Sequence, residues 1–544
     1  MRILAREDEV EDDHVDETDL RLQAPASAWR WTIAVAAVAA LPRLLYLFVF
    51  SNPENPGLGV YDDVWHHWQI AYLTKEIGLG APDGPRLWDL KGLDYFWGIL
   101  HPVLMVVVFA ITGSIDIVLL RLVSLVFGVL AVVLIFHICR RIWSTQVAIA
   151  ASFLAALLPT SVMNDASGML EPIGIALCLL GIWAWVDGKG WWSGLAFGLA
   201  AMARAEAWLF SLGLVVAANL RRVNLRQRPG LWLGFAGTLG LYMLILQAKT
   251  GNPIYPLWWN FFANALGQWG TPITSAQVGA RPALAIVLAL GLAGLGWALL
   301  YHPNGYMLFT FGFSYWVFTA GMLGFTSFLS TWQWWMPISR RFEFPYEFAG
   351  ILIAVVCLYA VPRRFGFPPS LLGWSAVAAV LIAAQLLWIP ISHAFAPTER
   401  AWNATAADAT LLASWYEMQP HRGHALAVPP DRPDMTYGLA RLGGVDGKHL
   451  VSEMYDPFGY LPAGYTYQGH ESALNNALQC WLDKNDVRMI AIANGDANRM
   501  LLRQLNPGWF VDIGELPHVG WHVDGVTVPP PEAGECQAAQ AAIR

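Results

Sequence analysis

Up to residue 391 the sequence alternates long apolar runs with short polar connections. The runs approach the roughly 20 residues that an α-helix needs to cross a bilayer. They lie near residues 29–50, 116–138, 144–161, 172–187, 231–248, 282–301, 305–325, 346–361 and 370–391. A further stretch, 191–219, is long enough for two short spans that separate at residues 203–206. We therefore predict a mostly α-helical, polytopic transmembrane bundle over residues 29–391, with about eleven spans.

After residue 391 the pattern changes to short apolar segments between Pro-rich turns. Segments 425–428, 489–493 and 509–513 have the length of strands, and 406–418 is helix-like. This predicts a small extracytoplasmic α/β domain over residues 392–544, with disorder expected over residues 526–544. Residues 1–28 are expected to form a disordered, acidic cytoplasmic tail, because Asp and Glu crowd its first 20 positions.

The composition supports a membrane protein and excludes an ordinary soluble domain. Hydrophobic residues make up 56% of the chain and charged residues only 13%, whereas soluble domains have about 25% charged residues. We expect membrane lipids around the chain and no nucleic-acid partner. The acidic N-terminal residues do not resemble a cleavable signal peptide, so the first span should remain as an anchor.

Arginines collect at three connections, and Lys and Arg are retained on the cytoplasmic side of membrane proteins. The clusters are Arg140-Arg141, Arg221-Arg222 with Arg226 and Arg228, and Arg363-Arg364. They share one side if the N-terminus is cytoplasmic and the stretch 99–112 is an interfacial helix, starting at His101-Pro102, that does not cross. The loops 51–115, 162–171, 249–281 and 326–345 then lie on the extracytoplasmic face with the C-terminal domain. The predicted localisation is the cell membrane, with many passes.

Two adjacent carboxylates, Asp62 and Asp63, follow closely after the first apolar run. Acids at the edge of a bilayer need an explanation, because burying each one in lipid costs about 3 kcal/mol. Neighbouring residues point about 100° apart in a helix, so one Asp can face a cleft while the other caps the helical pattern that follows. We expect at least one of them to be functional; capping alone is the alternative.

Glu171 ends the second outer loop, at the mouth of the following span. The positive end of a helix dipole stabilises a carboxylate at this position, which is its structural explanation. Its functional explanation is that it meets the carboxylates of the first loop, since acid–base catalysis and metal binding both need convergent oxygens.

Two further groups of charged residues are candidates. Arg204 and Glu206 interrupt an apolar stretch, where ionisable groups pair with each other or face a polar cavity. Arg340 and Arg341 lie in a predicted outer loop, where a guanidinium group can bind the phosphate of a lipid-linked ligand or simply contact lipid headgroups. Cys480 and Cys536 could form one disulfide if the C-terminal domain is extracytoplasmic.

The order of these features resembles the GT-C class of membrane glycosyltransferases, which use polyprenyl-phosphate-linked sugars. The shared features are one span, a long outer loop that opens with an acidic pair, the His101-Pro102 segment, a short acidic second loop, and a C-terminal outer domain. The stretch 198–206 adds the pattern Gly-Leu-Ala-x-x-x-Arg-x-Glu. The resemblance covers roughly residues 29–390.

Within this class, the chain is distantly similar to oligosaccharyltransferase catalytic subunits and to protein mannosyltransferase-like enzymes. Residues 63–78 resemble the opening motif of the former, and residues 168–176 resemble their second acidic motif with Glu171 in place of an Asp. Their Trp-Trp-Asp-Tyr-Gly signature is absent from residues 392–544. The resemblance therefore does not extend to recognition of an Asn acceptor.

The resemblance implies an inverting hexosyl or pentosyl transferase that moves a sugar from a polyprenyl-phosphate donor to a glycan, lipid or protein acceptor on the extracytoplasmic face. Asp63 or Asp62 would be the base. The implied substrate-binding residues are His66, His67, Arg204, Glu206, Arg340 and Arg341, with the arginines stabilising charge on the phosphate. His66 and His67 either position substrate or solvate the mouth of the loop.

Glu171 would hold the acceptor, or share a divalent cation, Mg²⁺ or Mn²⁺, with Asp63. Two other functions are compatible with a polytopic chain. A lipid or solute transporter or flippase should show broken helices in two related halves, and no internal repeat is visible. A non-catalytic membrane scaffold that presents the C-terminal domain would leave the Asp62-Asp63 loop unexplained.

Overall fold

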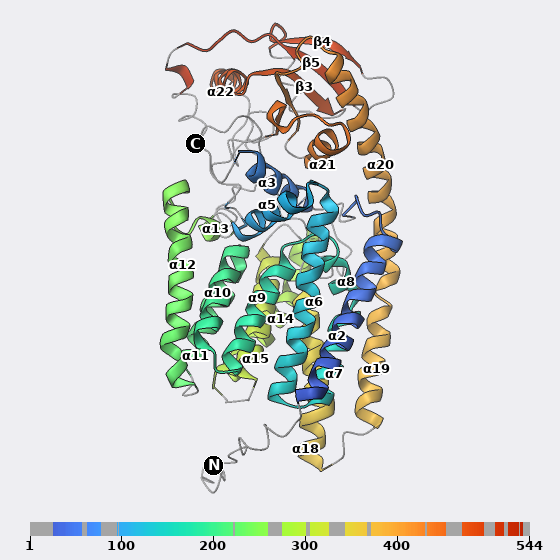
Figure 1. Ribbon diagram of the computed structural model, residues 1–544, viewed down its shortest axis with the longest axis vertical. Helices are drawn as coiled ribbons and strands as arrows, with labels where there is room; N and C mark the ends of the chain where they lie inside the picture. The colour runs from blue at the N-terminus through green and yellow to red at the C-terminus, as the bar shows by residue number, and fades with distance from the viewer. Residues whose placement is uncertain are drawn as a thin grey trace.

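The chain forms a long helical bundle with a small domain at one end (Figure 1). The computed structural model describes residues 25–56, 63–77, 95, 97–220, 224–258, 260, 275–300, 305–325, 343–366, 371–429, 432–452, 471–493, 506–515, 521–532 and 534–536. Most of the predicted acidic tail lies outside these residues, as do Asp62, Arg340 and Arg341.

The bundle is built from the apolar runs of the sequence. Its helices are α2 (Pro25–Leu45), α6 (Ile117–Ile142), α7 (Thr145–Leu157), α9 (Glu171–Val186), α10 (Gly190–Ala203), α11 (Ala205–Leu220), α12 (Arg228–Thr250), α14 (Ser275–Leu300), α15 (Tyr306–Phe325), α17 (Glu343–Val355) and α19 (Leu371–Gln385). A π-helical turn, Tyr46–Phe50, extends α2, and another, Val356–Ala360, extends α17.

Among the described residues, five helices are long and apolar enough to cross a membrane, and a bent pair makes a sixth. They are Trp29–Phe50, Ile117–Ile142, Leu225–Thr250, Arg281–Leu300 and Glu343–Phe365. The prediction of a polytopic, mostly helical membrane protein is therefore confirmed. The total of about eleven spans stays a prediction.

Two breaks in the bundle follow from local sequence. Helix α7 ends at Leu157 and α8 (Pro159–Asp165) starts at a proline, which is favourable in the first turn of a helix but cannot continue one. The two axes differ by 63°. Between α10 and α11, Arg204 has extended backbone angles, φ −152° and ψ 150°. The predicted separation of two short helices at residues 203–206 is confirmed.

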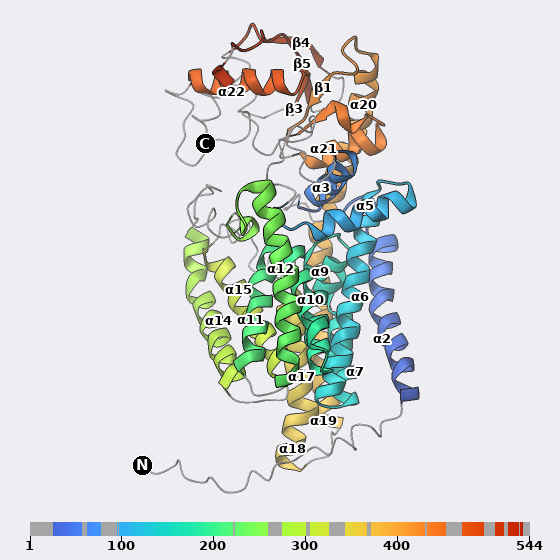
Figure 2. The ribbon, with the colours of Figure 1, turned by 60° about the vertical axis from the view of Figure 1, so that its left-hand side comes forward.

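One end of the bundle is covered by the short helices α3 (Asp63–Ile77) and α5 (Leu100–Thr112). Helix α5 lies across this end and does not follow the bundle axis (Figure 2), as the interfacial prediction requires. Asp116, just before α6, contacts the small domain, so α6 runs from this end to the opposite one. Arg140 and Arg141 in its last turn therefore lie at the far end, where Figure 1 also shows α18 (Val361–Phe365) with Arg363 and Arg364.

The small domain contains a five-stranded sheet with the strand order β2-β1-β3-β5-β4. The strands are β1 (Ala425–Ala427), β2 (Leu450–Val451), β3 (Val487–Ala493), β4 (Phe510–Glu515) and β5 (Trp521–Val526). Strand β1 pairs in parallel with β2 and β3, whereas β5 is antiparallel to β3 and β4. Helix α22 (Glu471–Lys484) packs its apolar stripe, Leu478, Trp481 and Leu482, against the sheet.

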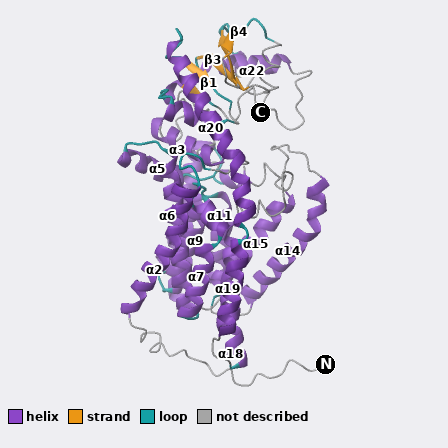
Figure 3. Ribbon diagram, turned by 90° about the vertical axis from the view of Figure 1, so that its right-hand side faces the viewer, coloured by secondary structure: helices purple, strands orange, loops and turns teal. Residues whose placement is uncertain are grey.

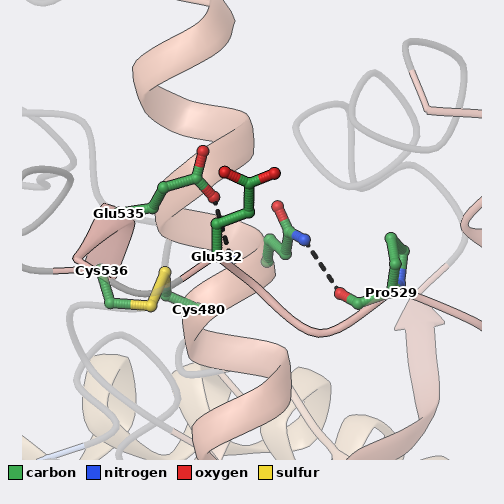
Figure 4. Close-up of a disulfide and its surroundings, with 6 residues drawn as sticks. Cys480, Pro529, Glu532, Glu535 and Cys536 are labelled. Carbon is green, nitrogen blue, oxygen red and sulfur yellow. Dashed lines mark hydrogen bonds between the residues drawn. A yellow bond between two sulfur atoms is a disulfide. The ribbon is translucent and has the colours of Figure 1, made fainter.

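Cys480 and Cys536 form a disulfide that ties the C-terminal segment to α22 (Figure 4). The Gln479 side chain also donates a hydrogen bond of 2.9 Å to the Pro529 carbonyl. Disorder was expected throughout this segment. That expectation is wrong for residues 526–532 and 534–536, which are held against α22, and residues 537–544 lie outside the described part of the chain.

Helix α20 (Trp388–Met418) joins the bundle to the domain without a break at the predicted boundary of 391/392 (Figure 3). The domain also rests on α3: Trp65 stacks on Trp402 of α20 and contacts Tyr437 of α21 (Pro433–Tyr437), with ring centroids 4.8 and 5.2 Å away. The Arg441 guanidinium pairs with the Asp116 carboxylate. Partial burial opposes ionisation of Asp116, but hydrogen bonds from Arg441 and Ser114 hold its pKa below the usual value.

Candidate functional site

A charged pocket lies at the domain-facing end of the bundle, where α9, α10 and α11 meet. Arg204 places its Nη1 atom 3.1 Å from the Glu171 carboxylate, and its Nε atom donates a hydrogen bond to Glu206. All three side chains are at least nine-tenths buried. The structure therefore brings Glu171, predicted at the end of the second outer loop, together with Arg204 and Glu206, predicted within one apolar stretch. In the pocket, Arg204 is flanked by the two carboxylates.

The local sequence explains why these side chains converge. Glu171 and Glu206 both lie in the first turn of a helix, where backbone N–H groups and the helix dipole stabilise a carboxylate. The extended backbone of Arg204 ends α10 and turns its side chain toward both acids. Phe210, Phe311 and Tyr315 complete the pocket, and this aromatic wall strengthens electrostatic interactions by excluding water.

A second cavity adjoins the charged pocket. It is lined by His67 of α3, by His101 of α5, and by Trp97, Gly98 and Leu170, the residue before Glu171. The His67 and His101 ring centroids are 5.9 Å apart, and the Trp97 ring meets His67 edge-on at 4.7 Å.

Gly98 is required for the close approach of the two sites. Its φ is +148°, and a Cβ atom at this position would lie 2.3 Å from the carbonyl oxygen of Met202, in the last turn of α10. Because Arg204 follows only two residues later, the chain before α5 is packed directly against the segment that carries the guanidinium.

Burial keeps the histidines of this region neutral. Desolvation lowers the pKa of His66 to about 4 and that of His101 to about 3. The pKa of His67 is also well below its usual value because of burial and of the nearby His101, Arg204 and His66. Each neutral imidazole has one hydrogen-bond donor and one acceptor.

Asp63 is the first residue of α3 and is partly exposed. Residues four apart share a helix face, so Asp63 and His67 lie on the same side of α3. His66 lies on the neighbouring face, close to Gln69. The other predicted site residues, Asp62, Arg340 and Arg341, lie outside the described residues.

A buried polar cluster continues from the charged pocket into the bundle. Arg43 of α2 pairs with Asp165 of α8 at 2.6 Å, and Asn164 donates a hydrogen bond to Glu343 at the start of α17. Glu347 is one turn further along α17, and all of these side chains are buried. Gly128 of α6 makes room for the pair, since a Cβ atom there would lie 2.1 Å from the Asp165 carboxyl carbon.

Arg121 of α6 supports the loops that lead to the site. This fully buried side chain donates hydrogen bonds of 2.7–2.9 Å to the carbonyls of Asn52, Pro53, Asn55 and Ala166. It also donates to the Ser51 hydroxyl at 3.0 Å. One guanidinium group thus fixes the start of the first outer loop against the second.

Sequence reasoning did not identify Arg43, Arg121 or Trp97 as important, and it treated His101 only as the start of a helix. Arg43 and Arg121 each stand alone within an apolar run, and their partners are far away in the sequence: Asp165 is 122 positions from Arg43. A single cation in a predicted span was the available signal, since such groups need a buried partner.

The described residues contain no group of three or more His, Cys, Asp or Glu side chains that could hold a metal ion. Glu171 is paired with Arg204, an arrangement that opposes cation binding. A divalent cation shared by Asp63 and Glu171 therefore stays a prediction.

Comparisons with known proteins agree with this architecture. Residues 98–246, which include α5 and the three charged residues of the pocket, match the family model described as dolichyl-phosphate-mannose-protein mannosyltransferase. A search of curated proteins gives no match. Apo ArnT from Cupriavidus metallidurans is similar in structure, with a TM-score of 0.51 and 14% identity over 93% of this chain and 100% of that chain.

Two further solved structures are more weakly similar. ArnT from Cupriavidus metallidurans bound to undecaprenyl phosphate has a TM-score of 0.48 and 15% identity, covering 94% of this chain and 100% of that one. The Archaeoglobus fulgidus oligosaccharyltransferase tethered with an acceptor peptide has a TM-score of 0.47 and 12% identity, covering 85% and 69%.

The expected resemblance to the GT-C class is confirmed: the chain has the fold of these membrane glycosyltransferases.

Proposed function

We propose that this protein is an inverting glycosyltransferase that moves a sugar from a polyprenyl-phosphate donor to an acceptor at the extracytoplasmic face of the membrane. One observation carries the proposal: in a GT-C fold, the helix that begins at Asp63 and the pocket of Glu171, Arg204 and Glu206 lie at the same end of the bundle. The family match over residues 98–246 supports a lipid-phosphate sugar donor.

In the proposed reaction the acceptor oxygen attacks the anomeric carbon of the donor sugar from the face opposite the phosphate. Asp63, or Asp62, takes the proton of the acceptor hydroxyl as the new C–O bond forms. The bond between the anomeric carbon and the phosphate oxygen breaks, and the polyprenyl phosphate leaves with the bonding electrons. Configuration at the anomeric carbon is inverted because a single displacement occurs.

Among the residues that the structure describes, Arg204 is the cation placed to stabilise the leaving phosphate. Its two carboxylate partners give the pocket a formal charge of −1, so the phosphate must compete with Glu171 or Glu206 for the guanidinium group. We propose that Glu171 releases Arg204 and binds the acceptor instead. Glu206 keeps its ion pair with Arg204 and so holds the guanidinium in its orientation. No step of this mechanism uses a metal ion.

The disulfide supports the proposed sidedness. Disulfides persist in oxidising compartments and are rare in the cytosol, so the Cys480–Cys536 bond favours an extracytoplasmic domain. The Arg140-Arg141 pair lies at the opposite end of the bundle, as expected for the cytoplasmic side.

Transfer assays on the full-length protein in lipid nanodiscs test the proposal. Wild type is supplied with polyprenyl phosphates that carry a labelled hexose or pentose, together with membrane lipid, glycan and peptide acceptors. We expect transfer from one of these donors, and we expect Asp63→Asn to lower kcat by about 10²–10⁴-fold, because it removes the base. Asp187→Asn, at the opposite end of α9 from Glu171, is the matched control and should behave as wild type.

Retained transfer in Asp63→Asn would remove Asp63 from the mechanism and leave Asp62 as the base. Absence of transfer from every donor by folded wild type would reject the enzyme, and uptake or flipping of labelled lipid without transfer would identify a transporter instead.

A further inference from the structure

The cavity between α3 and α5 contains a buried polar atom that has no hydrogen-bond partner within the described part of the chain. The His67 side chain is only 1% exposed, and its Nε2 atom has no hydrogen bond to any of the described residues. A buried nitrogen in this condition costs about 1–3 kcal/mol, and native proteins keep such groups satisfied by protein, water or ligand. An oxygen-bearing group in the cavity would satisfy it.

The chemistry of the lining selects among possible ligands. His101, 2% exposed, faces the same cavity, and the Trp97 ring and Leu170 supply apolar walls. Both imidazoles are neutral because burial lowers their pKa. A neutral imidazole matches a hydroxyl, which is itself both donor and acceptor, and it lacks the positive charge that a phosphate would need.

The position of the cavity relative to the charged pocket also fits a sugar. Leu170 lines the cavity and the next residue, Glu171, lines the pocket that contains Arg204. Gly98 packs against the backbone of Met202 and Ala203 on the other side. The Arg204 charge also acts on His67, so a sugar attached to a phosphate at Arg204 would lie near the histidines.

From this geometry we infer that the cavity is the subsite for a hydroxyl of the sugar ring carried by the donor, with His67 as its hydrogen-bonding partner and His101 as a second. The inference rests on the proposed function and deepens it, because it assigns the phosphate and the sugar of one substrate to two adjoining sites. The phosphate of the donor would bind to Arg204, and the sugar ring would be recognised by hydrogen bonds to the neutral histidines.

Single-deoxy analogues of the donor that wild type uses provide the test, with the full-length protein in nanodiscs. We expect one analogue to bind wild type about tenfold more weakly than the parent donor, because it lacks the hydroxyl that pairs with His67. In His67→Phe, which keeps a planar ring but no nitrogen, the parent donor should weaken to the same extent and that analogue should bind as well as the parent. His137→Phe, at the far end of α6, is the matched control and should keep the wild-type difference.

Free polyprenyl phosphate distinguishes the two parts of the donor. Its affinity should be the same for wild type and His67→Phe, and a tenfold loss in the variant would show that the cavity binds phosphate and would overturn the inference. A wild type that transfers sugar yet binds all deoxy analogues equally would also overturn it, without a folded variant being needed. Failure of transfer itself would instead reject the proposed function.

Discussion

At the residue scale, the site depends on two glycines, because a larger side chain at either position would not fit. Gly98 and Gly128 allow two close approaches, of the α5 lead-in to α10 and of α6 to the Asp165 carboxylate. Gly98 lies in the connection before α5, and Gly128 lies within α6. Gly128 makes room for the charged Asp165 side chain in a tightly packed bundle, and Gly98 lets the chain before α5 pack on the backbone next to Arg204.

We expect Gly128→Ala to destabilise the protein by about 1–3 kcal/mol, because the new methyl group must push the Asp165 side chain away from Arg43. The measurement is the thermal midpoint of the detergent-solubilised protein. Gly213→Ala is the matched control: it is also a helical glycine, nothing lies within 4 Å of a Cβ atom there, and it should stabilise α11 by about 0.5–1 kcal/mol. Equal midpoints for the two variants would contradict the packing argument.

At the element scale, the positions of helices followed from the sequence and the contacts between them did not. Apolar runs near the length of a span located the helices of the bundle, and the charges at 203–206 located a break because ionisable groups end a lipid-facing pattern. The Arg43–Asp165 pair could not be predicted, since a single sequence gives no sign of which of several acids an isolated arginine meets.

The cavity was hidden for the same reason. His67 was a candidate because it follows an acid in an outer loop. Its proximity to His101, however, depends on how α5 packs against α3. The predicted domain boundary rests on a different signal. Polarity changes at residue 391, but α20 continues through it, because helix formation depends on backbone hydrogen bonds and continues from lipid into water.

We expect Arg121 to contribute more to the stability of the protein than the other arginines of α6. Arg121→Met leaves up to four carbonyls without donors, two of them buried, and should cost more than about 3 kcal/mol of stability. Limited proteolysis between residues 51 and 62 and the thermal midpoint both measure the effect. Arg141→Met, on an exposed position in the last turn of the same helix, is the control, and the idea fails if it destabilises the protein as much as Arg121→Met.

At the scale of the whole molecule, α3 is held between two bodies. One face, with Trp65, Trp68 and Tyr72, contacts the C-terminal domain, and the face with His67 lines the cavity above the bundle. The Trp68 indole also donates a hydrogen bond of 2.6 Å to the Ile115 carbonyl. The domain therefore helps to set the position of the helix that begins at Asp63.

Tyr437→Ala should lower kcat by about tenfold or more with a smaller change in the donor KM, because it removes the ring that packs on Trp65 and Trp68 and lets α3 move. Tyr437→Phe keeps the ring and should retain most of the wild-type activity. Tyr416→Ala serves as control, since Tyr416 is equally buried in the same domain but bonds to the His424 carbonyl. If Tyr416→Ala slows turnover to the same degree, general loss of domain stability explains the result.

The continuous helix α20 has a mechanical consequence. A helix of 31 residues is a strut about 46 Å long, and a strut resists stretching in a way that a flexible linker does not. The domain is therefore kept at a fixed height above the bundle, so an acceptor of the proposed reaction would have to approach the Asp63 end of the bundle from the side.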